Sequence, residues 1–167
     1  MIFVTVGTHE QQFNRLVQKI DELKGSGEID EEVMIQTGYT TYIPKYCNYQ
    51  QFFKYSEMLM QVKKARIIIT HGGPSSFIMP LQIGKIPIVV PRMKKYDEHV
   101  NDHQLLFCQQ VAKRIGNIIL KENVEELMDT IKDYDKMVQN MKSGLNSNNI
   151  QFNHRLGEIV DELMKKK

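Results

Sequence analysis

The chain has 167 residues, which is enough for one hydrophobic core and short for two. Apolar residues make up 41% of it and charged residues 25%, a balance typical of a globular protein and not of a disordered or membrane-spanning chain. Because 22 basic side chains stand against 20 acidic ones, the formal net charge of +2 argues against nucleic acid as a partner.

The chain starts without the basic flank and long apolar centre of a signal peptide, and no stretch approaches the ~18 apolar residues of a membrane span. We therefore predict a cytosolic protein, in which any attachment to a membrane comes through a partner. In that compartment Cys47 and Cys108 are expected to be free thiols.

The first third of the chain predicts a strand, a helix and two further strands. Residues 1–6 (MIFVTV) form an apolar run that ends at Gly7, and apolar residues then recur at helical spacing over 13–23. A second strand is expected within 31–38 (EEVMIQTG). After a tyrosine-rich loop, a short third strand is expected within 49–53 (YQQFF).

The middle of the chain contains a buried strand that ends in a histidine and two glycines. A helix over 56–65 leads to the strand 66–70 (RIIIT), whose three isoleucines are typical of a parallel strand covered on both faces. The glycines at 72–73 allow a sharp turn that lies close to a ligand. One of the serines at 75–76 is expected to cap the following helix, predicted over 77–83.

The last part of the chain predicts two strands and three helices. A strand within 86–91 (IPIVVP) precedes a helix over 103–114, and a strand within 117–120 (NIIL) precedes a long amphipathic helix over 124–141. A final helix is expected over 156–163.

Alternating strands and helices with short connections predict an α/β fold, a doubly wound and mostly parallel sheet of about six strands with helices on both faces. We expect residues 1–167 to form a single domain, in which 122–167 make a C-terminal helical extension. Ligands of such folds bind beyond the carboxyl ends of the strands, which is where the polar clusters of this sequence fall.

The first polar cluster (VGTHEQ, 6–11) follows the first strand. Gly7 and Thr8, at the expected start of a helix, would offer backbone N–H groups to a phosphate. The spacing is not G-x-G-x-x-G, so the ordinary dinucleotide fingerprint is absent. Taken alone, the cluster fits a tight turn with a threonine cap equally well.

The second polar cluster (THGGPSS, 70–76) follows the isoleucine strand. His71 is placed to face a sugar or a phosphate, and the segment from Gly73 to Ser76 to bind a diphosphate at the start of a helix. Pro74 supports that helix start. A histidine at such a strand end, taken alone, is more often a structural hydrogen-bonding residue.

The third polar cluster (PRMKKYDEHVNDHQ, 91–104) has enough hydrogen-bonding side chains to recognise several sugar hydroxyls. Its candidate ligand-binding residues are Arg92, Glu98, Asn101, Asp102, His103 and Gln104. A zinc site is the rival interpretation, because His99 and His103 have the i, i+4 spacing of helical ligands. Against it, the H-E-x-x-H order is missing and there is no obvious third ligand.

Other catalytic signatures are absent. The DYD stretch (133–135) resembles a known metal–nucleotide motif, but it lies within a helical pattern and is better interpreted as a solvated helix face. The sequence has no G-x-S-x-G, no Walker lysine motif and no cysteine in a nucleophile signature. We predict neither a metal nor a resident cofactor.

Four stretches together resemble the donor-binding subunit of two-part glycosyltransferases, a glycosyltransferase family 28 C-terminal (GT-B C-terminal-like) domain. They are MIFVTVGTHEQQF, ITHGGPSSF, GKIPIVVPR and EHVNDHQLLF, and they cover about the first 120 residues in order. The family includes bacterial capsular and exopolysaccharide galactosyl- or glucuronosyltransferases and the eukaryotic dolichol-linked GlcNAc transferase. The resemblance implies one Rossmann-like half of a GT-B enzyme that binds a UDP-sugar.

The resemblance also implies roles for residues. The diphosphate would lie on the two glycine turns, and the sugar under the third cluster. The matched donor-binding positions are Gly7, Thr8, His71, Gly72, Gly73, Ser75, Ser76, Asn101, Asp102, His103 and Gln104. Uracil would lie near Phe52 or Phe53. Many relatives bind ribose through a glutamate at the position of Met79, so here Glu98 or backbone groups would have to hold the ribose.

A GT-B enzyme places donor and acceptor in facing domains, and this chain resembles only the donor half. The family implies a second, membrane-anchored subunit that holds a lipid-linked sugar, so we predict a heteromer at the inner face of the plasma membrane. The apolar stripe of the last helix (156–163) is a candidate docking surface, or it packs back on its own domain.

The implied reaction is an inverting transfer, with galactose to a lipid-linked sugar in bacterial polysaccharide synthesis as the expected case. Helix N-termini and Arg92, not a metal, would stabilise the leaving UDP. His9 is a candidate general base, unless the partner supplies it. Two alternatives remain open at this point: a non-catalytic nucleotide-binding module that regulates or scaffolds a partner, and a flavodoxin-like domain with another ligand.

Overall fold

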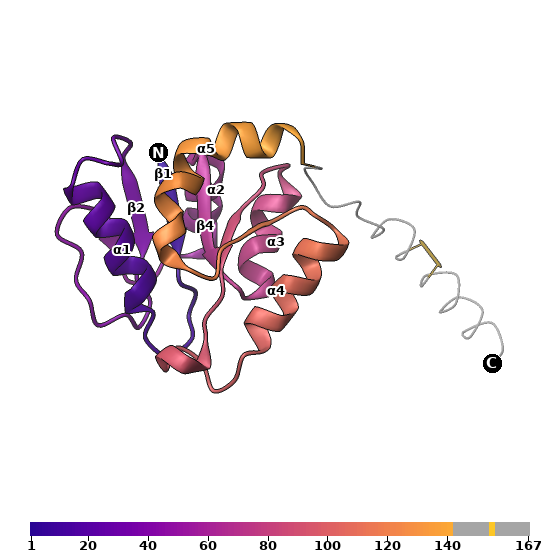
Figure 1. Cartoon of the computed structure of the whole chain (residues 1–167), viewed down its shortest axis with the longest axis horizontal. Coiled ribbons are helices and arrows are strands. Elements are labelled where there is room, and N and C mark those ends of the chain that lie inside the picture. The colour runs from indigo at the N-terminus through magenta and orange to yellow at the C-terminus, as the bar shows by residue number, and fades with distance from the viewer. Residues whose placement is uncertain (142–153, 156–167) are drawn as a thin grey trace.

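Six short strands form one sheet in the middle of the molecule, with helices around them, in the computed structural model (Figure 1), which describes residues 1–141 and 154–155. Every neighbouring pair is parallel, in the order β3-β2-β1-β4-β5-β6. The strands are β1 (Ile2–Thr5), β2 (Val33–Gln36), β3 (Asn48–Gln50), β4 (Ile67–His71), β5 (Ile88–Val90) and β6 (Ile119–Leu120). The predicted doubly wound α/β sheet is confirmed.

Helices lie on both faces of this sheet. The α-helices are α1 (Asn14–Gly25), α2 (Tyr55–Lys64), α3 (Pro74–Gln82), α4 (His103–Arg114) and α5 (Leu127–Gln139). Two short 3-10 helices, η1 (Lys94–Tyr96) and η2 (Val124–Glu126), precede α4 and α5. All five predicted helices within the described residues are present. The predicted last helix (156–163) lies outside the described residues.

Alternating side chains of the central strands enter separate apolar clusters. Ile2 and Val4 of β1 pack in the cluster that contains the apolar residues of α1 and α5, whereas Phe3 points to the cluster under α2. In β4, Ile67 and Ile69 pack in the cluster with α1 and α5, and Ile68 packs in the cluster under α2. A strand covered on both faces therefore needs apolar side chains at every position, which explains the isoleucine run.

The start of the C-terminal extension packs on the sheet. Leu127, Ile131 and Tyr134 of α5 belong to the main core cluster, and the Tyr134 hydroxyl donates to the Ile86 carbonyl at 2.7 Å. The prediction that the DYD stretch is a solvated helix face holds for Asp133 and Asp135, which are exposed, but not for the buried Tyr134 between them.

The carboxyl edge of the sheet brings the first two polar clusters together. Thr5, near the end of β1, is in register with Thr70 of β4 and with Gln36 of β2. The loops that follow β1 and β4 therefore leave the sheet side by side. Gly7 lies in the first loop with a φ of +76°, a conformation that favours glycine.

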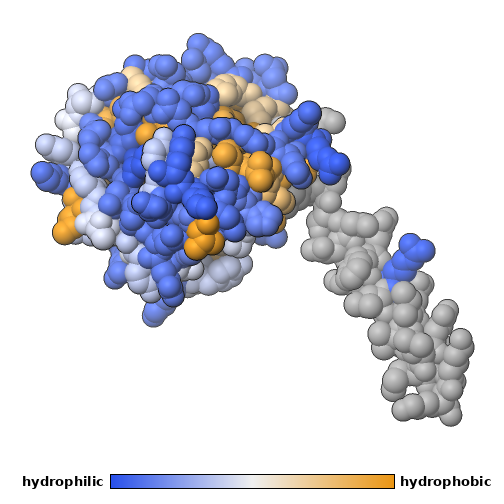
Figure 2. Space-filling view, turned by 60° about the horizontal axis from the view of Figure 1, so that its bottom comes forward, coloured by the Kyte–Doolittle hydropathy of each residue, from blue (hydrophilic) through white to orange (hydrophobic). Residues whose placement is uncertain are grey.

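The face of the molecule in Figure 2 is mostly hydrophilic, and its apolar side chains form small separate patches. In residues 1–141 and 154–155, no helix has the length and apolar character needed to cross a membrane. Cys47 and Cys108 are both buried and free, as predicted, and burial raises the pKa of each thiol to about 12.

Candidate functional site

The imidazole ring of His71 lies against both glycine turns. A Cβ atom added to Gly7 would lie 2.3 Å from His71 Nε2, and one added to Gly73 would lie 2.2 Å from His71 Cε1. Both positions need glycine because the ring fills the space that a side chain would take. The sequence predicted two turns at one site, and the structure places both of them against one buried ring.

The hydrogen bonds of His71 define its tautomer. The Gly73 N–H donates to Nδ1 at 3.0 Å, so Nδ1 carries no proton. Burial, with the positive charge of Arg92, lowers the pKa of His71 to about 4, so the ring is neutral near pH 7 and its proton is on Nε2. Nε2 then donates to the Ser76 hydroxyl at 2.9 Å. The hydroxyl proton of Ser76 is left to donate to a ligand.

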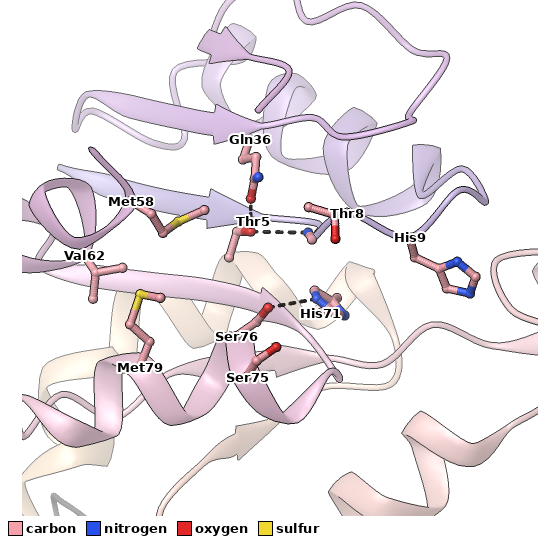
Figure 3. A pocket seen from close by; sticks show the side chains of 11 residues that line it. Thr5, Thr8, His9, Gln36, Met58, Val62, His71, Ser75, Ser76 and Met79 are labelled. Carbon is pink, nitrogen blue, oxygen red and sulfur yellow. Dashed lines mark hydrogen bonds between the residues drawn. The ribbon is translucent and has the colours of Figure 1, made fainter. Parts of the chain in front are cut away.

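A pocket of about 360 Å³ opens beside this ring (Figure 3). Its lining residues are Thr5, Gly7, Thr8, His9, Gln36, Met58, Val62, His71, Ser75, Ser76 and Met79. In Figure 3 the apolar side chains of Met58, Val62 and Met79 lie at one end and His9 lies at the other. The hydroxyl of Thr5 and the side chain of Gln36 form a hydrogen-bonded pair between these ends. The pocket therefore combines an apolar end with a polar end next to the glycine turns.

The structure corrects the predicted caps. The N-cap of α3 is Gly73, and its serines lie inside the first turn, where Ser76 bonds to His71 instead of capping the helix. The Gly73 and Ser76 N–H groups are bonded within the chain and Pro74 has none. Polar groups of this helix start that line the pocket therefore come from the two serines, Ser75 and Ser76.

The first turn does not lead directly into a helix. α1 begins only at Asn14, with Phe13 as its N-cap, so Thr8 is not a capping residue. The Gly7 N–H donates to the Thr5 hydroxyl at 3.3 Å. Of these two helices, only α3 begins directly after a glycine turn, so a helix N-terminus that could bind an anion lies at the second turn and not at the first.

His9 lies at the polar end of the pocket, as a candidate base should. Its ring is 4.8 Å from the His99 ring, in an edge-to-face arrangement. Burial, followed by the charges of Arg92 and His99, lowers the pKa of His9, which favours the neutral form that accepts a proton.

Arg92 and Glu98 are not at the surface of the pocket. Both are 0% exposed, so the predictions that Arg92 contacts the leaving diphosphate and that Glu98 holds ribose are wrong for this structure. The Arg92 guanidinium donates to four backbone carbonyls, and the Glu98 carboxylate bonds to Arg15 and to the Met93 N–H.

The third cluster divides into two parts. Asn101 and Asp102 are exposed, and their side chains accept the backbone N–H groups of His103 and Lys94. The other two candidates, His103 and Gln104, line a separate hollow of about 190 Å³ together with Gly72, Pro74 and Phe107. This hollow adjoins the second glycine turn, and its lining shares no residue with that of the main pocket.

The geometry also bears on the predicted uracil position and on the rival zinc interpretation. Phe53 packs edge-to-face against Phe3, with ring centres 5.9 Å apart, and neither Phe53 nor Phe52 lines the pocket. His99 precedes α4, which begins at His103, so the two histidines do not share a helix. Within the described part of the chain, no group of three or more histidine, cysteine or acidic residues is arranged to hold a metal ion.

Four lining residues were missed by the sequence analysis: Thr5, Gln36, Met58 and Val62. Thr5 and Gln36 could have been found, because each is the polar last residue of an otherwise apolar strand. Met58 and Val62 are four residues apart on α2, which is the spacing of a helix face, but nothing local says that this face borders a pocket. Met79, noted as a departure from the family pattern, does face the pocket.

A family model described as "Glycosyltransferase family 28 C-terminal domain" matches residues 1–163. The chain belongs to this family. It is therefore a glycosyltransferase family domain, and the sequence resemblance is confirmed at that level.

Individual proteins are also similar to the chain. The human protein "UDP-N-acetylglucosamine transferase subunit ALG13" is 29% identical over 121 residues, which cover 67% of this chain and 10% of that protein. The chain thus spans about a tenth of the length of this curated relative. A crystal structure described as the glycotransferase of kitacinnamycin has a TM-score of 0.53 at 16% identity, over 83% of this chain and 37% of that one, and supports the fold alone. The glycosyltransferase SnogD from Streptomyces nogalater has a TM-score of 0.48 at 16% identity, over 85% and 40%.

Proposed function

We propose that the chain is the donor-binding half of a glycosyltransferase that uses a UDP-linked sugar and works with a second, acceptor-binding subunit. The observation that carries the proposal is the contact of both Gly7 and Gly73 with the ring of His71. This contact brings two strand-end loops to one pocket, which matches the place where ligands of parallel α/β folds bind. Family membership supports the reaction class.

The polar end of the pocket suits a diphosphate. The hydroxyl of Ser76 has its proton free to donate, and Ser75 and Thr8 lie beside it in the lining. The charge of Arg92 lies behind the first turn and adds a positive potential without a direct contact. The apolar end, with Met58 and Met79, suits the flat faces of a nucleoside.

The transfer would be a single inverting displacement. The acceptor hydroxyl attacks the anomeric carbon, the bond from that carbon to the UDP oxygen breaks, and the electron pair leaves with UDP. The proton of the acceptor passes to a base, for which His9 is the candidate on this chain because its pKa is lowered. The pocket contributes by stabilising the charge that develops on the diphosphate.

The proposal extends to the acceptor, to the partner that binds it and to the sugar that is transferred. The human relative is named as a subunit, so we propose that a partner chain binds the acceptor. That partner would hold a lipid-linked saccharide at the membrane. Galactose in bacterial polysaccharide synthesis is the case expected from the sequence, and N-acetylglucosamine is the sugar in the name of the human relative.

The direct test is calorimetric titration of the isolated chain with UDP. The wild-type chain is expected to bind, and Ser76→Ala to bind about 10-fold more weakly, because a hydrogen bond to a charged group is lost. Ser56→Ala is the matched control, since Ser56 is exposed in the first turn of α2 and lies outside the pocket. Absence of UDP binding by the wild-type chain would contradict the proposal.

Transfer needs a second experiment. Membranes that contain the chain with an acceptor-binding partner, supplied with radiolabelled UDP-sugars, are expected to label a lipid-linked product that the chain alone does not form. His9→Ala should reduce this labelling much more than it reduces UDP affinity. UDP binding without transfer under any pairing would favour the non-catalytic nucleotide-binding module.

A further inference from the structure

We propose that Arg15 and Arg92 form a reciprocal latch that holds the β1–α1 loop (residues 6–13) and the β5–α4 loop (residues 91–102) in one arrangement around the donor pocket. The ligand part of this inference rests on the proposed function. Each arginine belongs to one side of the junction and bonds to the other side. Both are positioning residues, because they act on the pocket through the loops they join.

Arg92 reaches from the second loop into the first. Its guanidinium donates to the carbonyls of Val6 at 2.9 Å, Gln11 at 2.8 Å and Gln12 at 2.9 Å, and to the carbonyl of Glu98 in its own loop at 3.2 Å. Three carbonyls of a loop without regular structure are thus satisfied by a single buried side chain. Without it, the first loop would lose the bonds that fix its path on both sides of its pocket residues.

Arg15 reaches in the opposite direction. From α1 it donates through Nε and Nη2 to the two carboxylate oxygens of Glu98, at 3.0 Å each, and to the Pro91 carbonyl at 3.1 Å. A further bond of 3.0 Å joins it to the Glu122 carbonyl after β6. The Glu98 carboxylate also accepts the Met93 N–H, so the bidentate pair fixes the second loop from inside.

Phe13 lies within range of both cations. The guanidinium carbon of Arg15 is 5.5 Å from the centre of its ring and that of Arg92 is 4.8 Å away. Phe13 is 0% exposed and is the N-cap residue of α1. The cation–π contacts therefore connect the start of α1 to both halves of the latch.

The latch has a pocket on each side. The first loop carries Gly7, Thr8 and His9, which line the main pocket. On the other side, the backbone N–H of Arg92 donates to Gln104 Oε1 at 3.2 Å, and Gln104 lines the smaller hollow beside the second turn. A fixed loop loses less conformational freedom when a ligand binds, so the latch is expected to favour donor binding by preorganisation.

The test replaces both charged side chains of the Arg15–Glu98 ion pair at once. The variant Arg15→Met/Glu98→Gln is compared with Lys19→Met/Glu125→Gln, which removes the next ion pair of α1, between Lys19 and Glu125, outside the two loops. UDP affinity is measured by calorimetry, and hydrogen exchange is followed at the amides of Gly7 and Met93, one in each loop.

The latch predicts that the Arg15 variant binds UDP about 10-fold more weakly and that both amides exchange at least about 10-fold faster together, while the Lys19 variant stays within about 2-fold of the wild type in both readouts. Arg15→Lys, which keeps the charge but not the fork, is expected to recover part of the affinity. This single substitution also keeps the test valid if the double variant does not fold.

Two outcomes would overturn the latch: wild-type UDP affinity in the Arg15 variants, or equal losses in the Lys19 control. A wild-type chain that fails to bind UDP would instead refute the proposed function. In that case the exchange readout still decides, because the latch requires the two loops of the ligand-free protein to lose protection together.

Discussion

Replacing Gly7 by alanine tests the arrangement of the two turns around His71. The added Cβ would lie 2.3 Å from Nε2 and 2.8 Å from Cδ2 of the ring, about 1 Å inside ordinary contact. The ring cannot move away easily, because it is 8% exposed and bonded at both nitrogens. The substitution therefore adds a steric conflict in a site that is already filled.

Gly84→Ala is the matched control for backbone strain. Gly84 has the same φ of +76° as Gly7, but a Cβ there meets no atom within 4 Å. A left-handed alanine costs about 1–2 kcal/mol at either position. Overpacking adds about 1–3 kcal/mol at Gly7 alone. We expect a loss in the free energy of unfolding of about 2–5 kcal/mol for Gly7→Ala and about 1–2 kcal/mol for Gly84→Ala.

Urea unfolding followed by circular dichroism measures both losses. The double variant Gly7→Ala/His71→Ala lacks the steric conflict. Its loss in the free energy of unfolding should therefore be smaller than the sum of the losses of the two single variants. Equal destabilisation by Gly7→Ala and Gly84→Ala, or strict additivity with His71→Ala, would refute the idea that the His71 ring fills the space beside Gly7.

Two more predictions concern buried titratable groups. The pKa of His71, about 4, lies below that of a histidine in the unfolded chain, so its contribution to stability is present above pH 6.5 and is lost as the pH falls towards 4. In His71→Gln the urea midpoint should therefore depend less on pH over this range than it does in the wild type. The same pH dependence in both proteins would contradict this. Asp21 is 0% exposed and accepts hydrogen bonds from the Tyr42 hydroxyl and from three backbone N–H groups. Burial alone would raise the pKa of Asp21, but the hydrogen bonds together have the larger effect, so its pKa is lower than usual. Asp21→Asn should lower the free energy of unfolding by about 2–4 kcal/mol, measured by thermal or urea unfolding. The control Glu22→Gln, at an exposed position, should lower it by less than about 0.5 kcal/mol. Similar losses in the two variants would disprove the role of these hydrogen bonds.

Most of the fold could be predicted because the central strands have strong local patterns. β4 consists of residues that are buried on both faces, and its isoleucine run has no other simple explanation. The edge strand was harder: β3 covers Asn48–Gln50, and the prediction of 49–53 was displaced because all three residues are exposed and show no alternation.

The site could be predicted only in part. The glycine turns were found because glycine next to a buried strand has a local conformational meaning. Arg92 and Glu98 were misjudged as ligand contacts because the partner that explains Glu98, Arg15, lies 83 residues away in the sequence. A single sequence does not show such a pairing, and so a charged residue at a strand end looked like part of a binding surface.

The central claim is that the pocket beside His71 binds a nucleoside diphosphate. The most direct measurement is a titration of the isotopically labelled chain with UDP, followed by backbone amide NMR. The account predicts that the largest shifts fall on Thr8, His9, Ser75 and Ser76, all of which line the pocket. Shifts confined to other surfaces, or no shifts at millimolar UDP, would contradict it.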